Sequence, residues 1–96
     1  MKNDTFDVRL TRLVIKQLKK LPIHIVVKLQ AWIEDIGYSG LRNVRKTPGY
    51  HDEPLLGKRW GQRSIRLSKS YRAIYVIRQD GCIEFIEVIE VNKHDY

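Results

Sequence analysis

A glutamate in the middle of the chain has the surroundings of a general base. Glu53 follows His51 and Asp52 and leads into a segment rich in lysine and arginine. A carboxylate near several arginines stays ionised and can accept a proton from a hydroxyl group such as that of a ribose. The alternative is a loop carboxylate in a surface ion pair. A metal site is not expected, because adjacent residues rarely converge on one ion and no second ligand cluster occurs.

Two arginines stand on either side of a predicted turn. Arg66 and Arg72 fall in consecutive predicted strands, so a tight turn can bring both guanidinium groups to one patch. Each guanidinium fork matches two phosphate oxygens, and two forks can hold a phosphate as its charge changes. Two strand arginines that simply face water would show the same spacing, so the sequence leaves both interpretations open.

The end of the chain offers a proton donor. His94 and Tyr96 follow a long apolar strand pattern. Histidine is the natural general acid near neutral pH, and tyrosine can stack on a base or donate a hydrogen bond. A frayed tail is the alternative, and another group such as His51 would then have to carry the proton.

The chain is short and strongly basic. Its 96 residues fit a single domain, and 18 Lys and Arg against 11 Asp and Glu give a net charge of +7. Nucleic acid is the first expected partner, although a solvated basic surface would also explain the excess. Besides the two strand arginines, the cations expected to contact it are Arg45, Lys46, Lys58, Arg59, Arg63 and Lys69.

Cysteine content and hydropathy indicate a cytoplasmic protein. Cys82 is the only cysteine, so no internal disulfide is expected and a reducing compartment fits. No apolar run has the length needed to span a bilayer, and no signal-type segment follows Met1. We therefore expect no membrane association, and we expect no metal or other cofactor.

The first half of the chain predicts a strand and two helices. Residues 5–10 alternate between apolar and polar side chains, which is typical of a half-buried strand. Helical spacing follows over residues 11–21, and it resumes at Pro22, which suits a first helical turn, to end at Gly37 as a cap. Trp32 falls on the apolar face and is expected in the core.

The second half predicts a loop and three strands. Residues 37–61 are rich in Gly, Pro and charge, which indicates a long ordered loop with one short strand. Strand patterns return at residues 64–67, 71–77 and 82–91, with a type I′ turn expected at Asp80 and Gly81. The predicted fold is α+β in the order βααβββ, an N-terminal strand and a helical hairpin packed on an antiparallel sheet.

Five short segments together resemble the RelE/ParE toxin superfamily. They are LKKLP at residues 18–22, EPL at 53–55, SIRL at 64–67, YRAIY at 71–75 and HDY at 94–96. The resemblance covers nearly the whole chain, and it is strongest to the YoeB-like messenger RNA interferases. Two features depart from the family pattern: Asp95 separates the closing histidine and tyrosine, which are adjacent in the YoeB-like ending, and His51 and Asp52 precede the glutamate.

The resemblance implies a RelE-like fold and the toxin of a type II toxin–antitoxin system. Its activity would be that of a ribosome-dependent endoribonuclease, which inhibits translation by metal-free cleavage with the 2′-hydroxyl as nucleophile. Glu53 matches the general base, His94 the general acid and Tyr96 the group that positions substrate, while the phosphate clamp matches Arg66 and Arg72. The implied partners are messenger RNA, the ribosome and an acidic cognate antitoxin that covers the basic groove and binds operator DNA with the toxin.

Two other function classes stay open from the sequence. A ParE-like inhibitor would bind DNA gyrase and perform no chemistry, but such toxins usually lack an acid–base pair like Glu53 and His94. A plain nucleic-acid-binding module would show an affinity that falls steeply with salt and would form no product.

Overall fold

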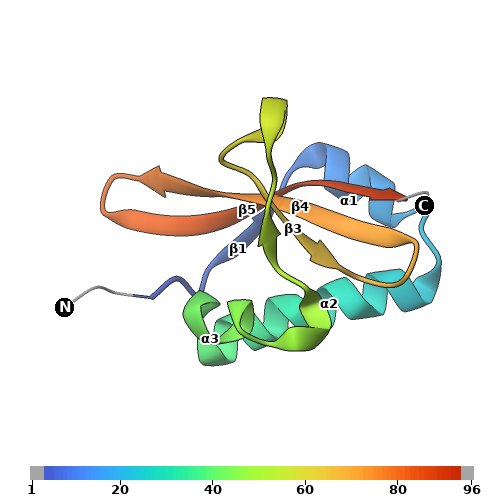
Figure 1. Ribbon diagram of the computed structural model, residues 1–96, viewed down its shortest axis with the longest axis horizontal. Helices are drawn as coiled ribbons and strands as arrows, with labels where there is room; N and C mark the ends of the chain where they lie inside the picture. The colour runs from blue at the N-terminus through green and yellow to red at the C-terminus, as the bar shows by residue number, and fades with distance from the viewer. Residues whose placement is uncertain (1–3, 94–96) are drawn as a thin grey trace.

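Five strands form one sheet in the order β1-β5-β4-β3-β2. The computed structural model describes residues 4–93, and its strands are β1 (Val8–Leu10), β2 (Glu53–Pro54), β3 (Arg63–Arg66), β4 (Tyr71–Asp80) and β5 (Ile83–Lys93). Neighbouring strands run antiparallel, except that β1 pairs in parallel with β5 (Figure 1). The predicted α+β fold is confirmed, and the parallel pair is a feature that the sequence pattern did not predict.

Two helices connect β1 to the rest of the chain. They are α1 (Arg12–Leu18) and α2 (Ile23–Ser39), and they confirm the predicted helical hairpin. Thr11 caps α1 by accepting a hydrogen bond from the backbone N–H of Val14 at 3.2 Å, and Pro22 directly precedes α2. No helix within residues 4–93 is long and apolar enough to cross a membrane.

The end of α2 differs from the prediction. The helix continues past Gly37 to Ser39, and Gly40 ends it with a φ of +83°. This position needs glycine for its backbone conformation, and a Cβ there would also displace the carboxylate of Asp4. Helical spacing locates the apolar face, but it does not reveal which of two nearby glycines the chain uses as a cap.

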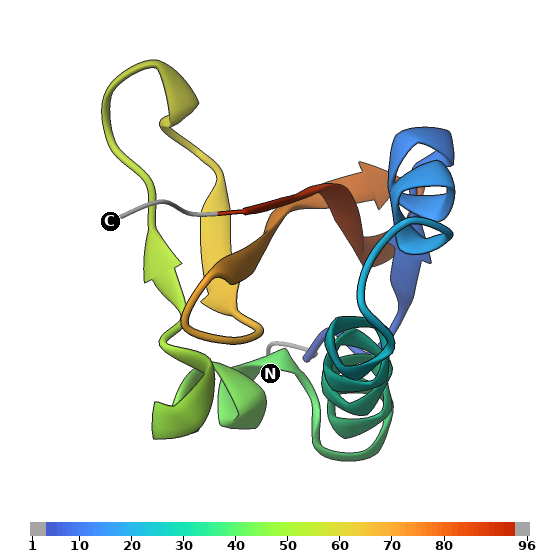
Figure 2. The ribbon, with the colours of Figure 1, turned by 90° about the vertical axis from the view of Figure 1, so that its right-hand side faces the viewer.

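The core lies between α2 and the sheet, and Figure 2 shows α2 and α3 on the same side of the sheet. Ile25, Leu29, Trp32 and Ile36 of α2 are all buried, at intervals of three or four residues. The Trp32 ring packs against Tyr75 of β4, with the two ring centroids 5.4 Å apart. The prediction that Trp32 belongs to the core is confirmed.

Residues 37–61 contain more regular structure than the predicted loop. The helix α3 (Leu41–Arg45) and two short 3₁₀ helices, η1 (Pro48–Tyr50) and η2 (Gly57–Arg59), accompany the short strand β2. Leu41 and Val44 of α3 are buried in the core at helical spacing. The glycines and prolines around them obscure this short signal in the sequence.

The turn between β4 and β5 lies one residue later than predicted. Asp80 pairs with Ile83, which leaves Gly81 and Cys82 as a two-residue loop. Gly81 has a φ of +61°, whereas Cys82 does not have a positive φ. This pattern fits a type II′ turn, which needs glycine at its first loop position, rather than the predicted type I′ turn.

Candidate functional site

A basic pocket of about 160 Å³ lies where β2, β3 and the beginning of β4 meet. Its lining comes from these strands, from the turn between β3 and β4, and from the corner that precedes β2. The lining residues are His51, Glu53, Ser64, Ile65, Arg66, Ser68, Lys69, Tyr71 and Arg72. Three residues that the sequence predicts as catalytic, Glu53, Arg66 and Arg72, therefore share one pocket.

Strand register explains why these three side chains meet. Arg66 and Arg72 are direct cross-strand partners, and Glu53 lies opposite Ser64. Ser64 and Arg66 are two residues apart on β3, so they project from the same face of the sheet. Glu53, Arg66 and Arg72 consequently lie on the face opposite the one that packs on α2.

The turn between β3 and β4 is held by its own side chain. The Ser68 hydroxyl oxygen accepts hydrogen bonds from the backbone N–H groups of Ser70 at 3.1 Å and Tyr71 at 3.2 Å. The backbone N–H of Leu67 donates to the Tyr71 carbonyl at 2.9 Å. These bonds make the tight turn that the sequence predicts between the two arginines.

A carboxylate on β5 helps to balance the charge of the paired arginines. Two cations directly opposite each other on neighbouring strands repel. The hydrogen bond from Asn92 and the contacts with Arg59 and Arg72 lower the pKa of Glu90, so its carboxylate stays ionised. The Nε atom of Arg72 is buried and forms no hydrogen bond within residues 4–93.

Asp52, the residue before Glu53, has its side chain buried on the opposite face of the sheet from the pocket. The Asp52 side chain is 1% exposed, and its carboxylate accepts hydrogen bonds from Arg63 Nε at 2.7 Å and from the Tyr75 hydroxyl at 2.6 Å. Burial and the bond to Asp52 raise the pKa of Tyr75, so its hydroxyl remains a donor. Because side chains alternate along a strand, burying Asp52 turns Glu53 outward to the pocket. Sequence reasoning missed this role of Asp52.

The other predicted cations have different surroundings. Lys69 lines the pocket, whereas Lys46 and Lys58 are exposed elsewhere. Arg59 forms an ion pair with Glu90, and Arg63 forms the ion pair with Asp52, with only 24% of its side chain exposed. The predicted contact of Arg63 with nucleic acid stays a prediction from the sequence.

The predicted proton donor and positioning group, His94 and Tyr96, lie outside the described residues. The last described residue, Lys93, pairs with Tyr71, which itself lines the pocket. Within residues 4–93, no three His, Cys, Asp or Glu side chains come close enough together to hold a metal ion.

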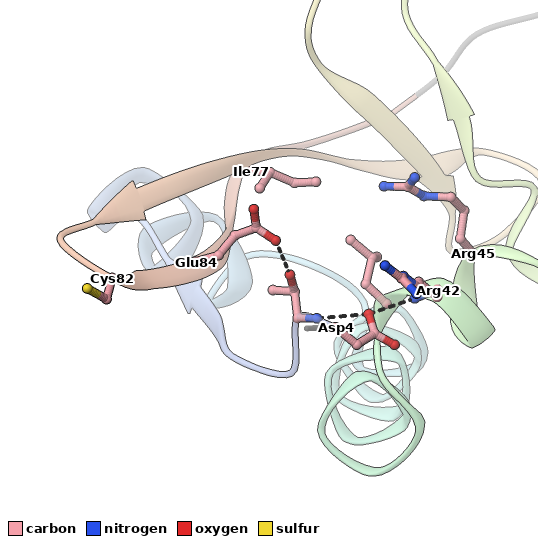
Figure 3. A pocket seen from close by; sticks show the side chains of 8 residues that line it. Asp4, Arg42, Arg45, Ile77, Cys82 and Glu84 are labelled. Atoms are coloured by element: carbon pink, nitrogen blue, oxygen red, sulfur yellow. Dashed lines mark hydrogen bonds between the residues drawn. The ribbon is translucent and has the colours of Figure 1, made fainter. Parts of the chain in front are cut away.

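A second and larger cavity, of about 620 Å³, lies between α3, the N-terminal segment and the β4–β5 hairpin (Figure 3). Its carboxylates already have partners. Asp4 accepts hydrogen bonds from the backbone N–H groups of Thr5 and Arg42, and Glu84 accepts one from the Thr5 hydroxyl. Arg45 lines this cavity, but none of the predicted catalytic residues within the described range does so.

Comparison with other proteins gives matches in structure alone. No protein-family model matches the sequence, and no curated protein matches it. The YoeB/ParE toxin from Agrobacterium tumefaciens superimposes with a TM-score of 0.63 at 23% identity, over 93% of this chain and 99% of that chain. The toxin–antitoxin complex RelBE2 from Mycobacterium tuberculosis gives 0.60 at 23% identity, over 94% and 99%.

A further structure extends the likeness. The YoeB–YefM complex from Staphylococcus aureus contains a chain that superimposes with a TM-score of 0.67 at 16% identity, over 93% of this chain and 97% of that one. At such low sequence identity, these superpositions show a shared fold. The chain has the fold of the RelE/ParE toxin superfamily.

Proposed function

We propose that the protein is the toxin of a type II toxin–antitoxin pair and acts as a ribosome-dependent messenger RNA endonuclease. The observation that carries this proposal is the pocket in which Glu53 faces the cross-strand pair Arg66 and Arg72. A carboxylate beside two guanidinium groups combines a proton acceptor with a clamp for phosphate. The fold, shared with proteins described as toxins, supports the same class.

In the proposed reaction, Glu53 removes the proton from a ribose 2′-hydroxyl, and the 2′-oxygen attacks the adjacent phosphorus. Arg66 and Arg72 stabilise the extra negative charge of the five-coordinate phosphorus. The products are a 2′,3′-cyclic phosphate and a 5′-hydroxyl. The resemblance implies that His94 donates the proton to the leaving oxygen and that Tyr96 positions the substrate, and both roles stay predictions from the sequence.

Positioning is the remaining requirement. General acid–base groups supply about 10²–10⁴-fold, so orientation of the RNA must supply much of the rest. The ribosome is the proposed source of that orientation, and the net charge of +7 favours binding to its RNA. An acidic antitoxin is the proposed inhibitor, because solved structures with this fold include a toxin–antitoxin complex.

The test is induction of the protein without its antitoxin, followed by primer extension on a defined transcript. We expect translation to stop and transcripts to break within codons. Glu53→Gln should abolish the breaks, whereas Glu34→Gln, at an exposed carboxylate of α2, should leave them unchanged. DNA breaks linked to gyrase with intact transcripts would instead identify a ParE-like inhibitor.

A further inference from the structure

One residue of the pocket has an uncommon backbone conformation. Among residues 4–93, His51 is the only residue other than glycine with a positive φ, and its φ and ψ are 46° and 50°. The left-handed region is unfavourable for a residue with a Cβ, because that atom crowds the backbone. Such a conformation persists only where the surrounding structure imposes it, and it concentrates at functional sites.

Both neighbours of His51 are tied to the interior. On one side, the Tyr50 hydroxyl donates to Asp35 Oδ2 of α2 at 2.6 Å, and Tyr50 is 5% exposed. On the other side, Asp52 is held through the Tyr75 hydroxyl and Arg63 Nε. Residues 50 and 52 are thus fixed to different elements, and the chain turns sharply between them. The exposed His51 side chain is left at the pocket.

The pocket places this imidazole among the groups of the proposed reaction. His51 and Glu53 are two residues apart and both line the cavity. Because β2 and β3 run antiparallel, the residues before Glu53 lie toward the Arg66 end of β3, and Arg66 lines the same pocket as His51. The other charged groups that line the pocket are Arg66, Lys69 and Arg72. A phosphate held by the arginines would have both Glu53 and His51 beside it.

We propose that His51 is a further catalytic residue, which donates a proton to the leaving 5′-oxygen. This inference rests on the proposed function. In the balanced step, Glu53 takes the 2′-hydroxyl proton, the O2′–P bond forms, and the P–O5′ bond breaks with its electron pair on O5′. The imidazolium of His51 then supplies the proton that makes the 5′-hydroxyl. This is the step that the resemblance implies for His94, so the experiment must separate the two histidines.

The left-handed backbone allows a sharp experiment, because asparagine and glycine both accept this conformation. In single-turnover cleavage on programmed ribosomes, His51→Asn should slow the chemical step by about 10²-fold or more while its Tm stays at or above that of the original protein. The cleavage rate of the original protein should fall at alkaline pH, where the proton donor is lost. The cleavage rate of His51→Asn should not show this fall. Added imidazole should restore cleavage to His51→Gly but not to Glu53→Gln.

The matched control is His24→Asn, at an exposed histidine of α2, which should cleave normally. A His51→Asn protein that cleaves at the original rate, or that is slower with an unchanged pH profile, would overturn the assignment. If only His94→Gln loses the fall of the cleavage rate at alkaline pH, the proton donor is His94 and the assignment to His51 is wrong. If Glu53→Gln is inactive while His51→Asn is active, only the inference fails. If the original protein cleaves no RNA, the proposed function fails as well.

Discussion

Removing the buried Asp52 carboxylate should cost far more stability than removing the carboxylate of Glu87, whose side chain is 27% exposed and which pairs with Arg78 at a similar distance. In Asp52→Ala, Arg63 and the buried Tyr75 hydroxyl both lose their acceptor. Breaking a buried ion pair costs about 3–5 kcal/mol. Since 24% of the Arg63 side chain is exposed and can be hydrated, we expect the lower end, about 3 kcal/mol. For a chain of this size, that corresponds to a fall in Tm of roughly 12–24 °C.

Two further variants isolate the cause. Tyr75→Phe removes one hydrogen bond and should cost about 1 kcal/mol. Glu87→Ala breaks the pair with Arg78, whose atoms are 3.0 Å apart and whose arginine side chain is 54% exposed, and it should cost at most about 1 kcal/mol. Because the Asp52 effects share an acceptor, the double variant Asp52→Ala/Tyr75→Phe should lose less than the sum.

The assay is urea unfolding at equilibrium, followed by circular dichroism, with Tm as a second measure. Burial is the quantity that differs most between the two ion pairs. Equal and small losses in Asp52→Ala and Glu87→Ala would refute the reasoning, because burial would then not decide the strength of the Asp52 pair. A purely additive double variant would show that Asp52 and Tyr75 do not act together.

Three other outcomes are expected. Arg72→Ala should reduce growth arrest per unit of soluble protein more than Lys69→Ala, because a strand-held guanidinium grips two phosphate oxygens, and equal losses would remove the clamp from the mechanism. Deleting residues 94–96 should abolish cleavage on programmed ribosomes and leave the fold and ribosome co-sedimentation intact, because the resemblance assigns the positioning of the substrate to Tyr96. The lowered pKa of Glu90 contributes stability above the ordinary glutamate pKa that is lost as pH falls through the folded value, so Glu90→Gln should flatten the acid side of a urea-midpoint profile.

The sequence predicts best what depends on local pattern. The strand pattern over residues 71–77 and the short turn between Arg66 and Arg72 are local, and the structure has both features. The parallel pairing of β1 with β5 joins Val8 to Ile86, a contact between distant residues that no local period encodes. The candidate site divides in the same way: residue type and spacing select Glu53, Arg66 and Arg72 as candidates, and all three line the pocket.

The buried position of Asp52, which anchors the strand that carries Glu53, could not be predicted from the sequence, because the contacts of Asp52 are not local. Asp52 looks like a surface carboxylate beside Glu53, and only the fold brings Tyr75, 23 residues away, to within 2.6 Å of it. His51, with its left-handed conformation, lies between this contact and the bond from Tyr50 to α2. Two adjacent acidic residues in the sequence therefore have opposite surroundings in the structure.

The alternation of side chains in the sheet links the buried Asp52 to the position of Glu53 in the pocket. On β3 and β4, Arg63 and Tyr75 project toward the α2 side, whereas the side chains of Arg66 and Arg72 project to the other. A strand as short as β2 has few ladder bonds to set its register, so the contacts of Asp52 must do so. A slip of one residue would bury Glu53 against the core and expose Asp52. The buried ion pair thus holds the proposed base on the correct face, which is why a stability measurement on Asp52 also tests the architecture of the pocket.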